Sequence, residues 1–149
     1  MNVGEICSRI VVFAESGTPV QQAAKLMRDH HIGALVVTEG AAGARRPIGI
    51  VTDRDLVVEV VAADVDYHTL SVGDIMSERP STIKEAAGLF EAAAQMRSGG
   101  VRRLVVVDAR EHLLGIVAMD DLLPVLAEEL SAISLAIRAE QRRETQRRR

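Results

Sequence analysis

The sequence predicts an α+β fold, α/β-like in its mixture of elements, made of two copies of one unit and a C-terminal helix. Residues 3–6, 27–28 and 35–37 return with the same or similar side chains at 72–75, 96–97 and 104–106, each displaced by 69 positions. Residues 49–51 and Asp55 return at 115–117 and Asp121, displaced by 66 positions. An offset this long, kept on both sides of one three-residue deletion, indicates a duplicated supersecondary unit.

The first unit is predicted to be β-α-β-β-α. Residues 3–7 form a helical turn, and the β-branched run at 10–13 favours a strand. Thr18 and Pro19 provide the cap and the first residue of a helix. The apolar face of that helix is made of Val20, Ala23, Ala24 and Met27. A buried strand at 35–37, a Gly- and Ala-rich loop at 39–46, a strand at 48–51 and a helix at 53–61 complete the unit.

The second unit repeats this order. Its strands are expected at 82–83, 104–107 and 114–117, and its helices at 89–96 and from Met119 onward. A short loop joins antiparallel strands and a helical crossover joins parallel ones, so each unit predicts a small mixed sheet. Neither unit buries a large core alone. We therefore expect packing through the two sheets with pseudo-two-fold symmetry, with repeat 1 at 1–68, repeat 2 at 69–125 and a helical extension at 126–149.

Composition restricts the class of protein. Of the 149 residues, 48% are hydrophobic and 2% aromatic, so the core is aliphatic and a ligand ring would find few aromatic faces. Cys7 is the single cysteine, which excludes an intrachain disulfide and favours a reducing cytoplasm. The N-terminus lacks the long apolar stretch of a signal peptide, and Glu128 and Glu129 interrupt the longest apolar run. We expect a cytoplasmic protein without a membrane segment.

The segment at 49–55, Gly-Ile-Val-Thr-Asp-Arg-Asp, carries the candidate chemistry. It places the Thr52 hydroxyl and the Asp55 carboxylate at a helix start, where free N–H groups and the helix dipole favour an anion such as phosphate. A carboxylate one turn into the helix can accept two hydrogen bonds from a vicinal diol, as in a ribose. These features predict a nucleotide pocket. The same residues also fit a capping box with Asp in place of Glu, and capping and binding can coexist.

At these residues the chain resembles the CBS (cystathionine β-synthase) domain family in its tandem form, often called a Bateman module. The resemblance covers nearly everything from Val3 to about Val125, and includes the strand entries at 31–35 and 101–104. It implies that an adenosyl compound, commonly AMP, ADP or ATP and sometimes S-adenosylmethionine, binds in clefts between the two repeats. It also implies a homodimer and a regulatory role.

The resemblance assigns roles to individual residues. Asp55 is expected to hold the ribose hydroxyls, Thr52 to touch a phosphate, and Asp121 to take the ribose role in the second cleft. The adenine is expected to lie near Val12, Phe13, Ile32 and Ala34.

The chain departs from the family pattern at three positions. Ala118 stands where Thr52 predicts a hydroxyl, and a hydrogen bond to a charged group is worth roughly 1.5–3 kcal/mol. The second cleft is therefore expected to be weaker or empty. Val36 and Val105 occupy positions where relatives often carry proline, which affects the strand edge beside the base.

Other candidate sites receive less support. Arg102 and Arg103 enter a strand of the second unit, and Arg103 is a candidate phosphate contact, since a guanidinium can bind phosphate bidentately, although an exposed arginine at a strand entry is usually solvated. His30 and His31 diverge by about 100° on a helix and make a poor joint metal site, so no metal is predicted. The sequence contains no nucleophile elbow, no His-Glu-x-x-His and no Walker-type loop, so an enzyme is not expected.

The C-terminal segment has a heptad-like apolar stripe, formed by Leu123, Leu126, Leu130, Ile133 and Ile137. The stripe either folds back onto the core of its own chain or pairs helices across a dimer. Beyond it, six arginines and two glutamates make a basic end. Nucleic-acid binding there is not favoured, because no aromatic residue interleaves the arginines.

The leading functional hypothesis is a regulatory module that binds an adenine nucleotide (AMP, ADP or ATP) and signals to an effector protein which the sequence does not name. The alternative is a ligand-free interaction or dimerisation scaffold with vestigial clefts. The missing hydroxyl at Ala118 and the lack of a joined domain favour the alternative.

Overall fold

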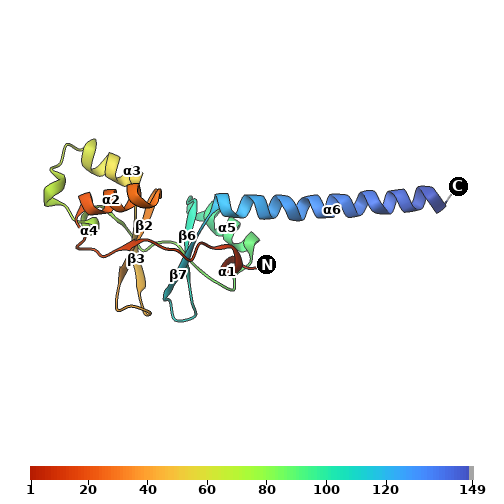
Figure 1. The fold of residues 1–149 in the computed structure, drawn as a ribbon, viewed down its shortest axis with the longest axis horizontal. Helices are drawn as coiled ribbons and strands as arrows, with labels where there is room; N and C mark the ends of the chain where they lie inside the picture. The colour runs from red at the N-terminus through yellow and green to blue at the C-terminus, as the bar shows by residue number, and fades with distance from the viewer. Residues whose placement is uncertain (148–149) are drawn as a thin grey trace.

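The computed structural model describes residues 1–147 and contains two small sheets side by side, with a long C-terminal helix projecting away from them (Figure 1). The first part of the chain forms α1 (Val3–Ile6), β1 (Phe13–Ala14), α2 (Val20–His30), β2 (Ala34–Glu39), β3 (Arg46–Thr52), α3 (Asp53–Asp55), the π-helix η1 (Leu56–Val61) and the 3-10 helix η2 (Tyr67–Thr69). The second part forms α4 (Val72–Ile75), β4 (Ser77–Glu78), β5 (Thr82–Lys84), α5 (Leu89–Gly99), β6 (Arg103–Val107), β7 (Leu113–Ala118) and α6 (Met119–Arg147).

The two sheets share one topology. The first has the order β1-β2-β3-β4 and the second the order β5-β6-β7. In each, the first strand is parallel to the second and the second is antiparallel to the third. The registers repeat as well, since Phe13 pairs with Val36 and Thr82 with Val105. The predicted α+β fold with small mixed sheets and a C-terminal helix is confirmed.

The units exchange their short N-terminal helices. Helix α1 lies beside β7 and α5 of the second unit (Figure 1), and Val3 is fully buried in that unit's core. Val72 of α4 is fully buried in the core of the first unit. The backbone contacts match, because Gly4 N donates to Glu85 O at 2.8 Å and Gly73 N donates to Ser16 O at 2.8 Å. Gly4 corresponds to Gly73 and Ser16 to Glu85 by the 69-residue offset. The two hydrogen bonds are therefore equivalent, and the two units are related by pseudo-two-fold symmetry.

Glycines permit this exchange. A Cβ on Gly115 would lie 2.7 Å from Ser8 O and 2.9 Å from Cys7 Sγ. A Cβ on Gly49, its equivalent, would lie 2.4 Å from Met76 Sδ. Each glycine therefore allows a close approach of the segment that follows the exchanged helix. Burial beside Gly115 raises the pKa of the Cys7 thiol.

The two sheets meet along an aliphatic seam. Val36, Val105 and Val107 are buried there, and Val11, Leu113 and Ile116 pack against them. Each unit also has its own cluster, of which Leu35 and Leu104 are fully buried members. The expected packing of two small cores through their sheets is thus what the structure contains.

Two details of the prediction need correction. The strand expected at 10–13 is limited to Phe13–Ala14, and Ile10 is 89% exposed. Ser8 bridges to Ile116 of the second unit, so the following residues cross between units and meet no ladder partner until Phe13. The helix expected at 53–61 is present, but residues 56–61 are wound as a π-helix.

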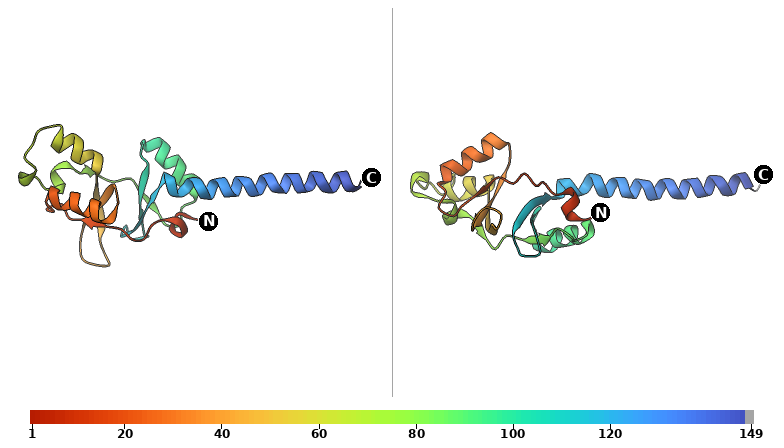
Figure 2. Two further views of the ribbon diagram at one scale, coloured as in Figure 1. Left: turned by 45° about the horizontal axis from the view of Figure 1, so that its top comes forward. Right: turned by 60° about the horizontal axis from the view of Figure 1, so that its bottom comes forward.

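Helix α6 is continuous across the predicted start of the extension at 126, with Pro124 inside it. Figure 2 shows in both views that it extends away from the two sheets. The stripe residues Leu130, Ile133 and Ile137 are 65%, 58% and 52% exposed. Leu126 packs against the core of the second unit. The alternative in which the stripe folds back onto its own core therefore holds at Leu126 and is wrong for Leu130, Ile133 and Ile137. Arg148 and Arg149 lie outside the described residues. Within 1–147, no helix is long and apolar enough to cross a membrane.

Candidate functional site

Thr52 and Asp55 lie at the end of β3 and the start of α3. The Thr52 N–H donates to Asp55 Oδ2 at 2.8 Å, and the Asp55 N–H donates to Thr52 Oγ1 at 3.2 Å. This reciprocal pair is a capping box, so the structural interpretation of the motif holds. Both side chains are only half-buried, so capping leaves them open to solvent on one side. Among residues 1–147, Oδ1 of Asp55 accepts no hydrogen bond.

A cavity of about 440 Å³ opens beside this helix start. The first unit contributes the end of β3 and the start of α3, including Ile50, Thr52 and Asp55. The segment at 79–81, which leads into β5, forms a second wall, and residues 100–103 with Val105 form the third. The cavity is therefore lined by residues of both units where the units meet.

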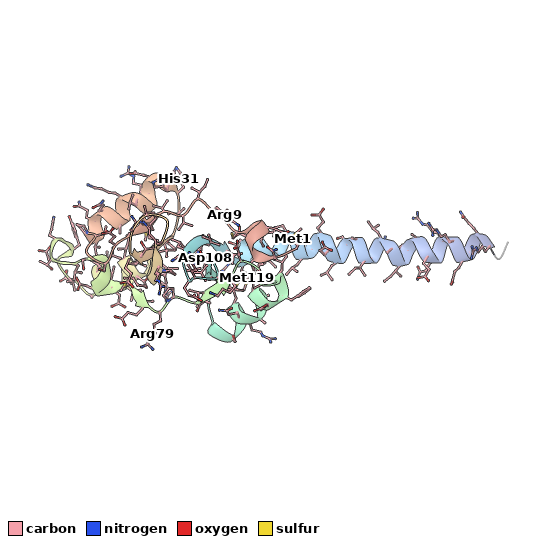
Figure 3. The ribbon with its side chains drawn as sticks, turned by 90° about the horizontal axis from the view of Figure 1, so that it is seen from below. Met1, Arg9, His31, Arg79, Asp108 and Met119 are labelled. Atoms are coloured by element: carbon pink, nitrogen blue, oxygen red, sulfur yellow. The ribbon has the colours of Figure 1, made fainter. Side chains whose placement is uncertain are left out.

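Four arginines line this cavity, namely Arg54, Arg79, Arg102 and Arg103. The carboxylates of Asp53 and Asp55 line the same cavity. Within 1–147, only Arg102 of the four forms an ion pair, with Asp120 at 3.4 Å. Figure 3 shows Arg79 extending outward at the edge of the molecule. The cavity is thus a net positive site that also carries the Thr52 hydroxyl and the carboxylates of Asp53 and Asp55.

The structure separates the remaining candidate residues from this cavity. Ala34 pairs with Thr52 in the sheet but does not line it, and Val12 and Ile32 pack against the first unit's own core. Phe13 lies under the Arg45 guanidinium, 4.2 Å from its ring centre, and lines a separate cavity of about 190 Å³. Val101 and Val105 of the second unit line the cavity instead.

The second helix start repeats part of the first. The Ala118 N–H donates to Asp121 Oδ2 at 2.7 Å, matching the bond between Thr52 and Asp55. Ala118 has no hydroxyl to accept from the Asp121 N–H, and Asp121 is exposed whereas Asp55 is half-buried. By the repeat offsets, Ile32 and Ala34 correspond to Val101 and Arg103, and so belong to the side of the seam that carries Asp121.

Sequence reasoning missed Arg54, Arg79, Ser81 and Val101 as cavity residues. The repeat offset could have identified two of them, because Ser81 and Val101 are the second-unit equivalents of the predicted residues Val12 and Ile32. These residues were missed because the cavity joins the helix start of one unit to the strand entry of the other unit. The contact between the two segments depends on how the units pack and is not visible in the sequence. No group of three or more metal-ligating side chains occurs in the part of the chain that the structure describes.

Comparison with known proteins agrees with this architecture. A model of the CBS domain matches residues 3–62 and 72–128. Protein MK0525 of Methanopyrus kandleri is 38% identical over 128 residues, which cover 84% of this chain and 62% of that protein. This chain therefore spans less than two thirds of that relative's length.

Two solved structures have the same fold. One is of a protein assigned to signal transduction, with CBS domains, from Burkholderia ambifaria, with a TM-score of 0.75 and 27% identity, covering 85% of this chain and 93% of that one. The other is the CBS domain pair of protein MJ0100 in complex with 5′-methylthioadenosine and S-adenosyl-L-methionine, with a TM-score of 0.74 and 22% identity, covering 87% of this chain and 98% of that one. With two family matches and a duplicated, pseudo-symmetric fold, the chain belongs to the CBS domain family and carries the domain twice.

Proposed function

We propose that this chain is a cytoplasmic regulatory module that binds an adenosyl nucleotide of the AMP, ADP or ATP type at the seam of its two units and signals to a partner protein. The observation that carries the proposal is the cavity of about 440 Å³ in which Thr52 and Asp55 of one unit face arginines of the other. Its volume is in the range of small-molecule sites.

The ribose is assigned to Asp55. Only Oδ2 of this carboxylate is used in capping among residues 1–147, so Oδ1 can accept hydrogen bonds from a vicinal diol. Ile50, Val101 and Val105 offer aliphatic surface for the base, in keeping with the few aromatic side chains of the chain.

The phosphates are assigned to the arginines. Guanidinium groups bind phosphate oxygens bidentately, and Arg54, Arg79 and Arg103 have no carboxylate partner within residues 1–147. The Thr52 hydroxyl lies on the same wall. A ligand with phosphates is therefore favoured over neutral adenosine.

The complex of MJ0100 supports the adenosyl class, since that protein holds two adenosyl compounds on the same fold. The ligands there carry no phosphate, whereas the cavity here has four arginines. This difference is the reason for proposing a nucleotide rather than S-adenosylmethionine for this chain.

Signalling requires a second surface, because a ligand shifts an assembly only through different affinities for two arrangements. We assign that role to a homodimer, with the repeats at 1–68 and 69–125 forming the sensor and residues 126–149 the extension that reaches other chains. Catalysis forms no part of the proposal.

The test is calorimetric titration of the chain with adenosine, AMP, ATP, S-adenosylmethionine and NADH. We expect AMP and ATP to bind more tightly than adenosine, and the gain over adenosine to shrink as salt is raised. At a hundredfold excess over the dissociation constant, a ligand should add about 2.7 kcal/mol of apparent stability in thermal unfolding.

The capping box favours a second candidate, the ligand-free scaffold, because it gives Thr52 and Asp55 a structural role that needs no ligand. If the chain is such a scaffold, no adenosyl compound gives binding heat in the titration, while the chain still associates with itself or with a partner.

A further inference from the structure

Beyond Leu126, which packs against the second unit, helix α6 carries an apolar stripe that nothing within residues 1–147 covers. Every residue from 127 to 147 is exposed, including Leu130 at 65% and Ile133 at 58%. Helices in water gain most of their stability by packing an amphipathic face. A helix of 29 residues with such a stripe is therefore expected to pack against another surface.

The stripe runs into a groove at the base of the helix. Leu126, Leu130 and Ile133 form one wall of a space of about 490 Å³, and Met1, Leu89 and Phe90 are among the residues of the other wall. Phe90 is 77% exposed, although phenylalanine is one of the residue types most often buried in folded proteins. The exposed apolar surface thus extends from the projecting helix onto the second unit.

Charge is segregated along the same helix. Residues 119–129 contain Asp120, Asp121, Glu128 and Glu129 and no basic residue. Residues 130–137 contain no charged residue, and residues 138–147 contain four arginines and two glutamates. The helix is therefore acidic near the module, neutral in the middle and basic toward its end.

We propose that a second copy of this chain covers the stripe, with the two α6 helices antiparallel. In the register that matches the apolar positions, Leu130 lies opposite Ile133 of the second copy, and Leu126 lies opposite Ile137 of the second copy. This register brings the basic end of each helix to the acidic start of the other. A parallel pair would instead place acidic beside acidic and basic beside basic residues.

The same register fills the groove. Ile137 of the second copy reaches the level of Leu126, where Phe90 and Met1 are open to solvent. The inference rests on the homodimer of the proposed function and specifies the helices that form it. It needs no nucleotide.

The first experiment measures the mass of the full chain in solution by sedimentation. We expect two chains per particle for the wild type and for Leu135→Asp, because Leu135 is exposed to a similar extent as Ile133, at 64% against 58%, but lies off the stripe. Ile133→Asp should weaken the pairing roughly a hundredfold, since a carboxylate would be buried without a partner. A monomeric wild type, or a fully dimeric Ile133→Asp, overturns the proposal.

The second experiment fixes the orientation in a Cys7→Ser background. The double variant Leu126→Cys/Ile137→Cys should oxidise to bonds between position 126 of one chain and 137 of the other, and Leu126→Cys alone should not cross-link. Cross-links between the two copies of position 126 would show a parallel pair and overturn the proposal.

Nucleotide titration of Ile133→Asp separates this inference from the proposed function. Loss of pairing with retained nucleotide affinity supports α6 as the dimer surface. A variant that stays dimeric with unchanged affinity refutes the α6 pairing and leaves the nucleotide site in place.

Discussion

The helix start after β3 and the helix start after β7 have the same backbone hydrogen bond but different side chains around it. Both carry an aspartate that accepts from the residue before the helix, at 2.8 Å for Asp55 and 2.7 Å for Asp121. The side chains around them differ at most polar positions, with Ser77 and its counterpart Ser8 as an exception. Thr52, Arg54, Arg79, Arg102 and Arg103 of the first cavity correspond to Ala118, Asp120, Ile10, Gly33 and Ala34 by the repeat offsets.

This comparison separates two kinds of residue in the duplicated unit. The residues that hold the units together are retained, as in Gly49 and Gly115 or Val3 and Val72. Among the residues that line the first cavity, Asp55 and Ser77 are retained as Asp121 and Ser8, whereas the Thr52 hydroxyl and the arginines are not retained. The shape of the pair therefore requires both copies, whereas the four arginines and the hydroxyl belong to the first cavity.

The largest expected difference between the clefts is in ligand affinity. Asp55→Ala should weaken AMP binding by about tenfold to a hundredfold, because hydrogen bonds to a charged group are worth roughly 1.5–3 kcal/mol each. Asp121→Ala is the matched control and should leave the affinity unchanged. Calorimetric titration of both variants decides the point, with thermal unfolding to verify folding. Equal losses would show that the two clefts are equivalent.

The two exchanged helices can be compared through their glycines. Gly115→Ala should lower the free energy of unfolding by about 1–3 kcal/mol, since the new methyl group meets the Ser8 carbonyl and cannot displace backbone cheaply. Gly49→Ala should cost less, because the nearest atom is the Sδ of the flexible Met76 side chain. Urea unfolding measures both. A larger loss for Gly49→Ala would contradict this ranking.

The missing hydroxyl can be restored. Ala118→Thr should stabilise the chain by about 1 kcal/mol, because its hydroxyl can accept from the Asp121 N–H as the Thr52 hydroxyl accepts from the Asp55 N–H. Ala118→Val has the same shape without the hydroxyl and serves as the control in urea unfolding. Equal stability of the two variants would exclude the capping explanation.

The smallest expected effect concerns pH. Hydrogen bonds from the backbone N–H groups of His112 and Arg110 lower the pKa of Asp108, and its first-unit counterpart Glu39 makes no such bonds within 1–147. A lowered carboxyl pKa gives stability that is present above the ordinary value, near pH 4, and is lost as pH falls through the lowered pKa. Asp108→Asn should flatten the acid side of the Tm profile, and Glu39→Gln should not. A wild-type slope retained in Asp108→Asn would refute the assignment.

Much of the fold follows from local pattern. The repeat offset and the alternation of β-branched runs with helical faces are local, and the sheets and helices they predict are present. The expected Thr18 cap is wrong, because α2 starts at Val20 after Pro19 and the Thr18 hydroxyl accepts from the Glu15 N–H instead. The strand at 10–13 was wrong because its residues have good strand propensity but no partner strand at that point. Strand propensity is a property of single residues, whereas a strand forms only where a neighbouring strand supplies hydrogen-bond partners.

The site was predictable in part. Thr52, Asp55 and Arg103 were found from chain neighbours and share one cavity. Arg79 and Val101 were not found, because they approach Asp55 only when the second unit packs across the seam.

The sequence by itself determined the duplication, the order of elements in each unit, the aspartate at each helix start and the hydroxyl at only one of them, because all of these are matters of residue identity and spacing. The tertiary structure decided that α1 and α4 cross to the opposite unit, that the strand entry of one unit completes the cavity of the other, and that the stripe of α6 stays exposed. These outcomes depend on contacts between residues distant in the chain, which are fixed by how the two aliphatic cores share buried surface rather than by any local pattern.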